Sequence, residues 1–204
     1  MIDLNYAETL FNHLYGNIKG YEVSSKARTD SGLDTSNFLY GELPFETAKQ
    51  IFEKANPKPD GVMIDLGSGT GRVVLEAYLI TNFKKTIGVE LLAGLHNKAC
   101  EVKQEFETNI KPQITKDLEG RQLEFVQGDI FKFDCREADF IFMNHPIKDS
   151  DLFLQLEEKL LNELKPGTKI ATIIRALRNP KFKSLGSQTY QFSWGNSTAH
   201  FFEV

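Results

Sequence analysis

Hydrophobic positions along the chain alternate between the spacing of a buried strand and that of a helix. Five short apolar runs have the length and flanking turns of buried strands: residues 62–64, 86–89, 123–126, 140–143 and 170–174. Between them, apolar residues recur at helical spacing, as in the stretch that contains Val73, Ala77 and Tyr78. Strands that alternate with helices predict an α/β fold, a mostly parallel sheet with helices on both faces.

The first 58 residues carry a helical pattern and no strand pattern. Leu10 and Leu14 share one face of a first amphipathic helix, and residues 24–36 are polar enough to predict an irregular segment. Pro44 suits the first turn of a second helix, which the proline- and glycine-containing run at 56–61 ends. We therefore expect a short N-terminal helical extension over residues 1–58 and a main domain over residues 59–204.

The end of the chain changes character. Leucines at helical spacing predict a helix that stops at Pro166 and Gly167. Residues 190–194 and 198–202 then alternate apolar and polar side chains around Gly195-Asn196. Such a pattern predicts a terminal antiparallel hairpin.

Length and charge narrow the class of protein. The 204 residues, 41% of them hydrophobic, suffice for one core, and a net charge of −4 argues against a broad basic surface, so nucleic acid is not a favoured partner. The N-terminus lacks a signal-peptide pattern, and no apolar run is long enough to span a membrane. Cys100, Cys135 and the four histidines show no metal-ligand spacing. We expect a soluble, cytoplasmic protein without a metal and with reduced thiols; the sequence does not indicate the oligomeric state.

The strongest candidate site is the stretch DLGSGTGR, residues 65–72, directly after the first predicted strand. Gly67 and Gly69 remove Cβ atoms that would keep a ligand from the backbone, and the turn leads into the start of a helix. The glycine spacing is not that of a dinucleotide fingerprint, and Asp65 lies two positions ahead of the first glycine. A carboxylate there opposes a pyrophosphate and suits a cationic amino group, so the turn predicts a ligand with an amino-acid end.

Two more acids follow the next two strands. Glu90 ends the second predicted strand, where a carboxylate can accept hydrogen bonds from both hydroxyl groups of a ribose. Asp129 follows the third, where it can accept from the amino group of an adenine while Ile130 covers the ring. The carboxyl ends of parallel strands meet at one edge of a sheet, so we expect these acids to share one site with Asp65.

Together these motifs resemble those of class I S-adenosylmethionine-dependent methyltransferases, over roughly residues 60–204. The resemblance implies a Rossmann-like sheet of seven strands that ends in an antiparallel hairpin, with S-adenosylmethionine as cofactor. It further implies that Asp65, Gly67, Ser68 and Gly69 contact the methionine end of the cofactor. Glu90 and Leu91 would then contact the ribose, and Asp129 and Ile130 the adenine.

Asn144 follows the fourth predicted strand, in Met143-Asn144-His145-Pro146. In class I enzymes this position faces the atom that accepts the methyl group, and the Asn144 carbonyl is suited to orient an amine. A simple cap of the strand end is the alternative. The match to the Asn-Pro-Pro-aromatic motif of enzymes that methylate nucleobases or glutamine is weak, because His145 and Ile147 replace two of its residues.

A closer resemblance is to the non-SET histone-lysine methyltransferases of the disruptor-of-telomeric-silencing type. It rests on Tyr40-Gly41-Glu42 ahead of the first strand, on Asn144, and on Ser193-Trp194 with Phe201-Phe202. It implies that the loop with Tyr40 and Glu42 covers the cofactor, and that Asn144, Trp194 and Phe201 line a narrow channel for a lysine side chain. Phe201 stands where that family has a tyrosine, and a lone tryptophan in a terminal strand is also typical of a core.

The sequence thus predicts an enzyme that transfers a methyl group from S-adenosylmethionine to an acceptor, an amine such as a lysine side chain of a protein partner. The acceptor must arrive neutral, and a dry aromatic channel favours the neutral amine. Two alternatives stay open. One is a class I methyltransferase that acts on a small molecule or nucleic acid, and the other is a domain that binds S-adenosylmethionine without catalysis.

Overall fold

The computed structural model describes residues 2–144 and 147–204. Six α-helices lie in these ranges: α1 Leu4–Tyr15, α2 Gly20–Ser31, α3 Phe45–Ala55, α4 Arg72–Ile80, α5 Ala93–Glu105 and α6 Ser150–Glu163. Seven strands accompany them: β1 Val62–Leu66, β2 Lys85–Glu90, β3 Gln122–Gln127, β4 Phe140–Met143, β5 Lys169–Ile173, β6 Lys183–Phe192 and β7 Gly195–Glu203. None of the helices in this described part is long and apolar enough to cross a bilayer.

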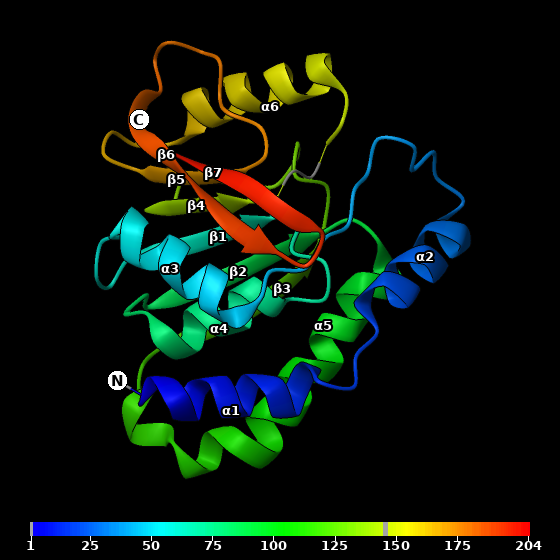
Figure 1. Cartoon of the computed structure of the whole chain (residues 1–204), viewed down its shortest axis with the longest axis vertical. Helices are drawn as coiled ribbons and strands as arrows, with labels where there is room; N and C mark the ends of the chain where they lie inside the picture. The colour runs from blue at the N-terminus through cyan, green and yellow to red at the C-terminus, as the bar shows by residue number, and fades with distance from the viewer. Residues whose placement is uncertain (1, 145–146) are drawn as a thin grey trace.

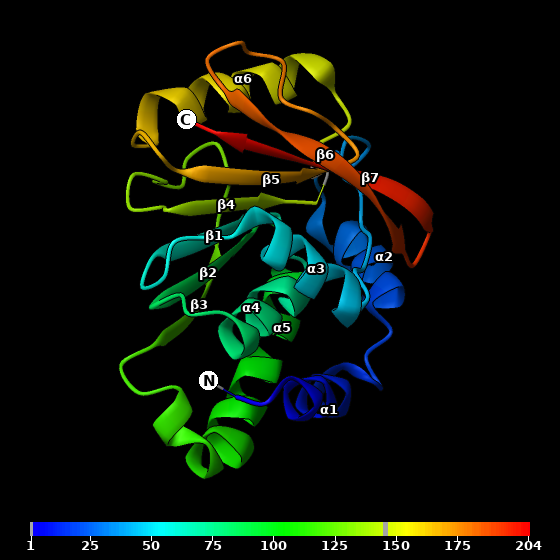
Figure 2. The same cartoon turned by 60° about the vertical axis from the view of Figure 1, so that its left-hand side comes forward.

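All seven strands form one sheet in the order β3-β2-β1-β4-β5-β7-β6. The first five run parallel, and β7 is antiparallel to both β5 and β6. Figures 1 and 2 show α3 and α4 against one face of this sheet and α6 on the other. The predicted α/β sheet with a terminal antiparallel hairpin is confirmed. The strand order reverses between β1 and β4, the place where open parallel sheets bind their ligands.

Two apolar layers hold the sheet between its helices. One joins α1, α3 and α4 to the sheet through buried residues that include Phe11, Phe52, Tyr78 and Phe140. The other packs α6 against the opposite face through residues such as Leu160. Burial of this much apolar side-chain surface is the main stabilising contribution to such a fold. The two layers position the carboxyl ends of the central strands.

The expectation of an irregular segment at residues 24–36 is wrong for residues 24–31, which are helical. Helix α2 covers Gly20–Ser31, and Gly32 ends it with φ +65°, a left-handed conformation that glycine adopts without strain. The helix packs closely on α5, where Ala27 faces Gly94. A Cβ atom built on Gly94 would lie only 2.8 Å from the methyl group of Ala27. A polar helix with so small a buried face leaves no clear apolar period in the sequence.

The terminal hairpin turns two residues earlier than predicted. Phe192 pairs with Gly195, so Ser193 and Trp194 form the turn and Gly195-Asn196 already belongs to β7. Trp194 is therefore a turn residue with 38% of its surface exposed, where a strand residue was expected. Its ring stacks on Phe192, with centroids 4.7 Å apart, and its Nε1 donates to Ser197 Oγ at 2.8 Å. These contacts fix the indole at the tip of the hairpin.

Candidate functional site

A cavity of about 320 Å³ opens at the carboxyl ends of β1, β2, β3 and β4. Every residue that the sequence predicts to bind the cofactor lines it: Tyr40, Glu42, Asp65, Gly67, Ser68, Gly69, Glu90, Leu91, Asp129, Ile130 and Asn144. They come from four strand ends and from the segment between α2 and α3. The structure thus brings together residues that are up to 104 positions apart in the sequence.

Asp65 is the most unusual group of the cavity. Its side chain lies in the next-to-last position of β1, 2% exposed, and its Oδ1 has no hydrogen-bond partner. Burial raises the pKa of this carboxyl well above its usual range, and the nearby Glu90 raises the pKa further. A buried carboxylate without a partner is costly, and a cationic ligand group would supply the missing partner. Asp65 therefore fits the amino group of an amino-acid ligand.

Glu90 ends β2 and holds the glycine turn. Its Oε2 accepts from the backbone N–H of Gly69 at 2.8 Å, and its Oε1 accepts from that of Leu92 at 2.9 Å. Burial raises the pKa of the Glu90 carboxyl, while these backbone donors lower it. A carboxylate has about four acceptor positions, so two stay available for hydroxyl groups of a ligand.

Asp129 follows β3 and shapes the third side of the cavity. Its Oδ1 accepts from the backbone N–H of Phe131 at 2.9 Å, and its Oδ2 lies 3.9 Å from Lys132 Nζ. The preceding Gly128 donates its N–H to the backbone oxygen of Glu90 at 2.9 Å, which ties this loop to the end of β2. The carboxyl group keeps acceptor capacity toward the cavity, next to the apolar side chain of Ile130.

The loop with Tyr40 and Glu42 covers the glycine turn. The Tyr40 hydroxyl donates to Glu42 Oε1 at 2.8 Å and lies 3.3 Å from Thr70 Oγ1. Burial, and then the Glu42 charge, raise the pKa of Tyr40. Both side chains press against Gly20, the first residue of α2: a Cβ atom at Gly20 would lie 1.8 Å from Glu42 Oε1. The acid therefore lies at the positive end of α2, which stabilises its negative charge.

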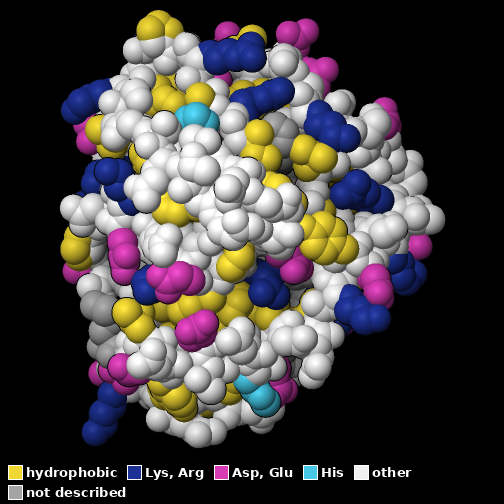
Figure 3. All heavy atoms as spheres, viewed as in Figure 1, with side chains coloured by type: hydrophobic (Ala, Val, Ile, Leu, Met, Phe, Trp, Pro, Cys, Tyr) yellow, Lys and Arg dark blue, Asp and Glu magenta, His cyan; other side chains and the backbone are white. Residues whose placement is uncertain are grey.

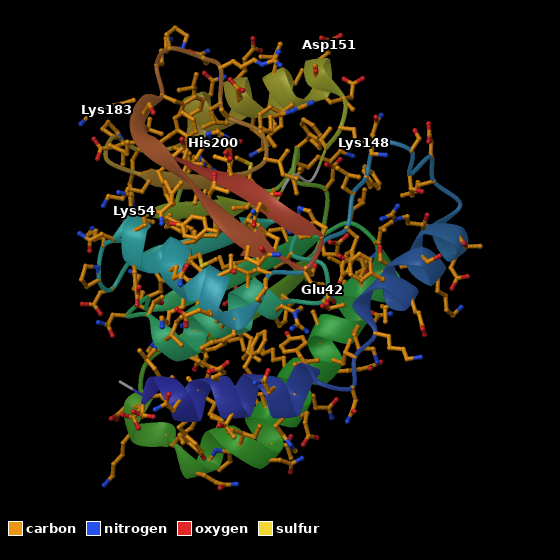
Figure 4. The ribbon with its side chains drawn as sticks, viewed as in Figure 1. Glu42, Lys54, Lys148, Asp151, Lys183 and His200 are labelled. Carbon is orange, nitrogen blue, oxygen red and sulfur yellow. The ribbon has the colours of Figure 1, made fainter. Side chains whose placement is uncertain are left out.

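The same loop is fastened to the far side of the cavity. Asn144 Nδ2 donates to the backbone oxygen of Gly41 at 2.9 Å, and Ser193 Oγ donates to that of Glu42 at 2.9 Å. The Trp194 ring covers Gly41 so closely that a Cβ atom there would lie 2.4 Å from it. Figure 4 shows Glu42 where α2, the loop and the hairpin tip meet. The loop is a fixed wall of the cavity in this structure.

Helix α1 supports the turn from behind. The Tyr15 hydroxyl donates to the backbone oxygen of Thr70 at 3.1 Å, and burial raises the pKa of this tyrosine. The Arg72 guanidinium lies 4.8 Å from the ring centroids of both Phe11 and Tyr15, a cation–π arrangement. The N-terminal extension is thus part of the site's support, which its sequence did not indicate.

Two residues predicted for a lysine channel are not among the residues that line this cavity. Phe201 is 2% exposed and packs in the core beside Ala171 of β5, because its strand is inside the sheet and this face is covered by helices. Trp194 caps Gly41 from the hairpin tip and does not line the cavity. Asn144 does line it, as predicted. His145, which the sequence placed near the chemistry, lies outside the described residues.

The sequence missed several cavity residues. Ser24 and Arg28 come from α2, which was predicted as irregular, and Phe38 and Leu39 come from the loop ahead of Tyr40. Phe142 reaches the cavity from β4. The i, i+4 spacing of Ser24 and Arg28 is the signal that would have shown a shared helical face.

Comparison with known proteins agrees with this site. The profile of the family described as "Histone methylation protein DOT1" matches residues 28–195. A Caenorhabditis elegans protein named "Histone-lysine N-methyltransferase, H3 lysine-79 specific" is 35% identical over 138 residues, which are 65% of this chain and 14% of that protein. A Saccharolobus islandicus "Protein-lysine N-methyltransferase" is 28% identical over 144 residues, which are 70% of this chain and 81% of that protein. The chain therefore spans a small part of its worm relative and most of the length of its archaeal one.

Solved structures share the fold. An RNA methyltransferase from Salinibacter ruber, in complex with S-adenosyl-L-homocysteine, superposes with a TM-score of 0.54 at 22% identity and covers 80% of this chain and 93% of its own. The rRNA methyltransferase aviRa from Streptomyces viridochromogenes gives 0.57 at 16% identity, over 84% of this chain and 93% of its own. At such identities the likeness shows a Rossmann-like methyltransferase fold. The family match over most of the chain goes further, and the chain belongs to the DOT1 family of histone methylation proteins.

Proposed function

We propose that this protein transfers a methyl group from S-adenosylmethionine to a lysine side chain of a protein. The observation that carries the proposal is the cavity itself. It combines an unpartnered buried carboxylate at Asp65 with carboxylates at Glu90 and Asp129, under a loop that belongs to the matched family region. These groups fit the amino end, the ribose and the adenine of the cofactor in turn.

The names of the relatives support a protein acceptor. The worm relative is named for a histone lysine, and the archaeal relative, 81% of which is matched by this chain, is named for a protein lysine. The face seen in Figure 3 supports the same choice, because side chains of both charges are interspersed on it. A broad basic surface, which a nucleic-acid acceptor favours, is not seen on that face.

The chain's own residues have mainly to position two reactants. S-adenosylmethionine, when bound, supplies an activated methyl group, so alignment and exclusion of water are the protein's main tasks. The glycine turn, supported by Glu90 and by Tyr15, fixes where the amino-acid end lies. The loop from Phe38 to Glu42 closes the cavity over it.

Asn144 is placed to orient the acceptor. Its Nδ2 is already used in the hydrogen bond to Gly41, so its Oδ1 is the atom left to accept a hydrogen bond from an amine. Apolar and aromatic neighbours such as Leu39 and Phe142 line the same cavity. A dry, apolar surrounding favours the neutral amine that the transfer requires.

The experiment has two arms. Isothermal titration with S-adenosylmethionine should show binding to the chain and none to Gly67→Arg, whose side chain would fill the turn; equal affinity of the two would refute the assigned site. Tritiated methyl transfer is then measured separately on protein, RNA and metabolite extracts, with Gly67→Arg as the inactive control. Label in protein alone supports the proposal. Label in RNA or in metabolites only would assign a different acceptor, and binding without any label would indicate a non-catalytic domain.

A further inference from the structure

Ile174 has a backbone conformation that is rare for its residue type. It directly follows β5 with φ +71°, in the left-handed region, which β-branched residues strongly avoid. The backbone N–H of Arg175 donates to the oxygen of Ile173 at 2.9 Å, so Ile174 is the central residue of a γ-turn of the strained hand. Glycine would adopt this conformation without strain.

The surrounding residues hold this turn in place. Arg175 Nη2 donates to the Lys148 backbone oxygen at 2.7 Å, and its guanidinium lies 5.0 Å from the Phe153 ring centroid. Thr172 Oγ1 donates to the Arg175 backbone oxygen at 2.6 Å. Because Arg175 is fixed on one side of the turn and β5 on the other, the conformation of Ile174 is imposed by its neighbours.

The strained conformation does not bury Ile174. Its side chain is 47% exposed, although isoleucine is among the residues most often buried. Residues whose strained backbone is held by the surrounding structure are found most often at ligand-binding and catalytic sites. An exposed, strained, apolar residue is therefore a candidate for contact with a partner.

Ile174 lies at the rim of the candidate site. Met143, the residue before Asn144, pairs with Thr172, so Ile174 lies just beyond the level of Asn144 on the neighbouring strand. Its backbone N–H donates to the oxygen of Thr198 at 2.8 Å, close to the hairpin tip that carries Trp194. Figure 2 shows the ends of β4 and β5 and this hairpin at the same edge of the sheet.

Two more exposed apolar side chains come from segments that meet there. Leu39 lies in the loop whose Asn37 oxygen accepts from the Lys148 N–H at 2.9 Å, and Figure 4 shows Lys148 beside that loop. Leu39 and Trp194 are 39% and 38% exposed. Ile174 also lines a shallow depression together with Ala176 and the two arginines Arg175 and Arg178. The rim that a substrate must pass is thus apolar at several points.

We propose that Ile174 is a specificity residue that contacts an apolar side chain of the substrate protein next to the acceptor lysine. The proposal rests on the proposed function, since it requires a protein acceptor that extends from the cavity across this rim. Water released between two apolar side chains would favour such a substrate over one with a polar residue at the same place.

The test uses Ile174→Gly in the full chain. Glycine accepts the left-handed turn, so the melting temperature of the variant should equal or exceed that of the wild type. S-adenosylmethionine affinity should stay within about twofold, while methyl incorporation into a protein extract should fall on the order of tenfold. Ile174→Leu keeps an apolar side chain and should keep most of the incorporation. Leu185→Ser removes a 37% exposed apolar side chain of β6, seven residues before that strand ends, and should leave incorporation unchanged.

The outcomes separate the inference from the function on which it rests. Equal or higher melting temperature with unchanged incorporation in Ile174→Gly would overturn the inference, because the isoleucine side chain would then make no contact that affects methyl transfer. Equal losses in Ile174→Gly and Leu185→Ser would overturn it too, since the effect would not belong to the rim. A wild-type chain that binds the cofactor but labels no protein would instead refute the proposed function.

Discussion

Replacing Asp65 by asparagine should make the protein more stable and its cofactor site weaker. The Asp65 carboxyl is 2% exposed with Oδ1 unpartnered, and its pKa is raised well above the usual value by burial and by Glu90. A raised pKa means that the native state binds this proton more tightly than the unfolded chain does. The contribution of the protonated Asp65 carboxyl to folding stability is therefore complete below its unfolded pKa of 3.8. That contribution is lost as the pH rises through the raised pKa of the native state.

In the absence of a ligand an ionised Asp65 is thus a destabilising group, and asparagine removes its charge with little change of shape. A buried polar group without a partner costs about 1–3 kcal/mol, and more when it is charged, so loss of the charge should stabilise the fold although the amide stays buried. For a domain of this size each kcal/mol changes the melting temperature by about 2–4 °C. The cofactor-free Asp65→Asn variant should therefore melt several degrees higher near pH 7, with a smaller gain as the pH is lowered.

The same change removes the partner of the cofactor's amino group. A hydrogen bond to a charged group contributes about 1.5–3 kcal/mol, so affinity for S-adenosylmethionine should fall about 10- to 150-fold. Thermal melts across pH measure the gain in melting temperature, and isothermal titration measures the loss of S-adenosylmethionine affinity. Asp129→Asn is the matched control, because Asp129 is only partly buried and should give no gain in stability. A lower melting temperature together with unchanged affinity in Asp65→Asn would refute the reasoning.

Three further predictions concern the loop and the acceptor. Gly20→Ala puts a methyl group 1.8 Å from Glu42 Oε1, so Glu42 must move. Titration should show weaker cofactor binding, while the melting temperature should stay within a few degrees of the wild type. Unchanged affinity would contradict the role of α2. Glu42→Ala should also weaken titrated affinity, and if it does not, the loop is only a turn. Asn144→Ala should keep cofactor affinity and lower the methyl-transfer rate, whereas Asn144→Asp, which keeps an acceptor oxygen, should retain more of it; equal losses would show that the bond to Gly41 is what matters.

Much of the fold and of the cofactor site could be predicted because their signals are local. A strand, a glycine turn and a helix follow one another within Val62–Ile80, and each leaves its own spacing of apolar residues. Glu90 and Asp129 follow their strands directly, and parallel strands bring their carboxyl ends to one edge. Their common site therefore follows from the strand pattern and the parallel arrangement.

The predictions were wrong or incomplete where the pattern was weak. Helix α2 buries so little apolar surface, chiefly Ala27 against α5, that its polar sequence resembled a loop. The hairpin turn was placed at Gly195 because glycine favours turns, whereas pairing of Phe192 with Gly195 moves the turn onto Trp194. Register is set by side chains packed against neighbouring strands, and turn residues alone do not determine it.

The sequence by itself determined the strands, the helices with a clear apolar face, the glycine turn and the carboxylates at the strand ends, since periodicity and turn chemistry act over a few residues. Only the tertiary structure decided that Gly20 lies against Glu42, that Tyr15 supports the turn at Thr70, and that Phe201 is a core residue. These contacts join residues that are far apart in the chain. They arise from the way helices and strands pack, and such packing leaves no repeating spacing in the sequence.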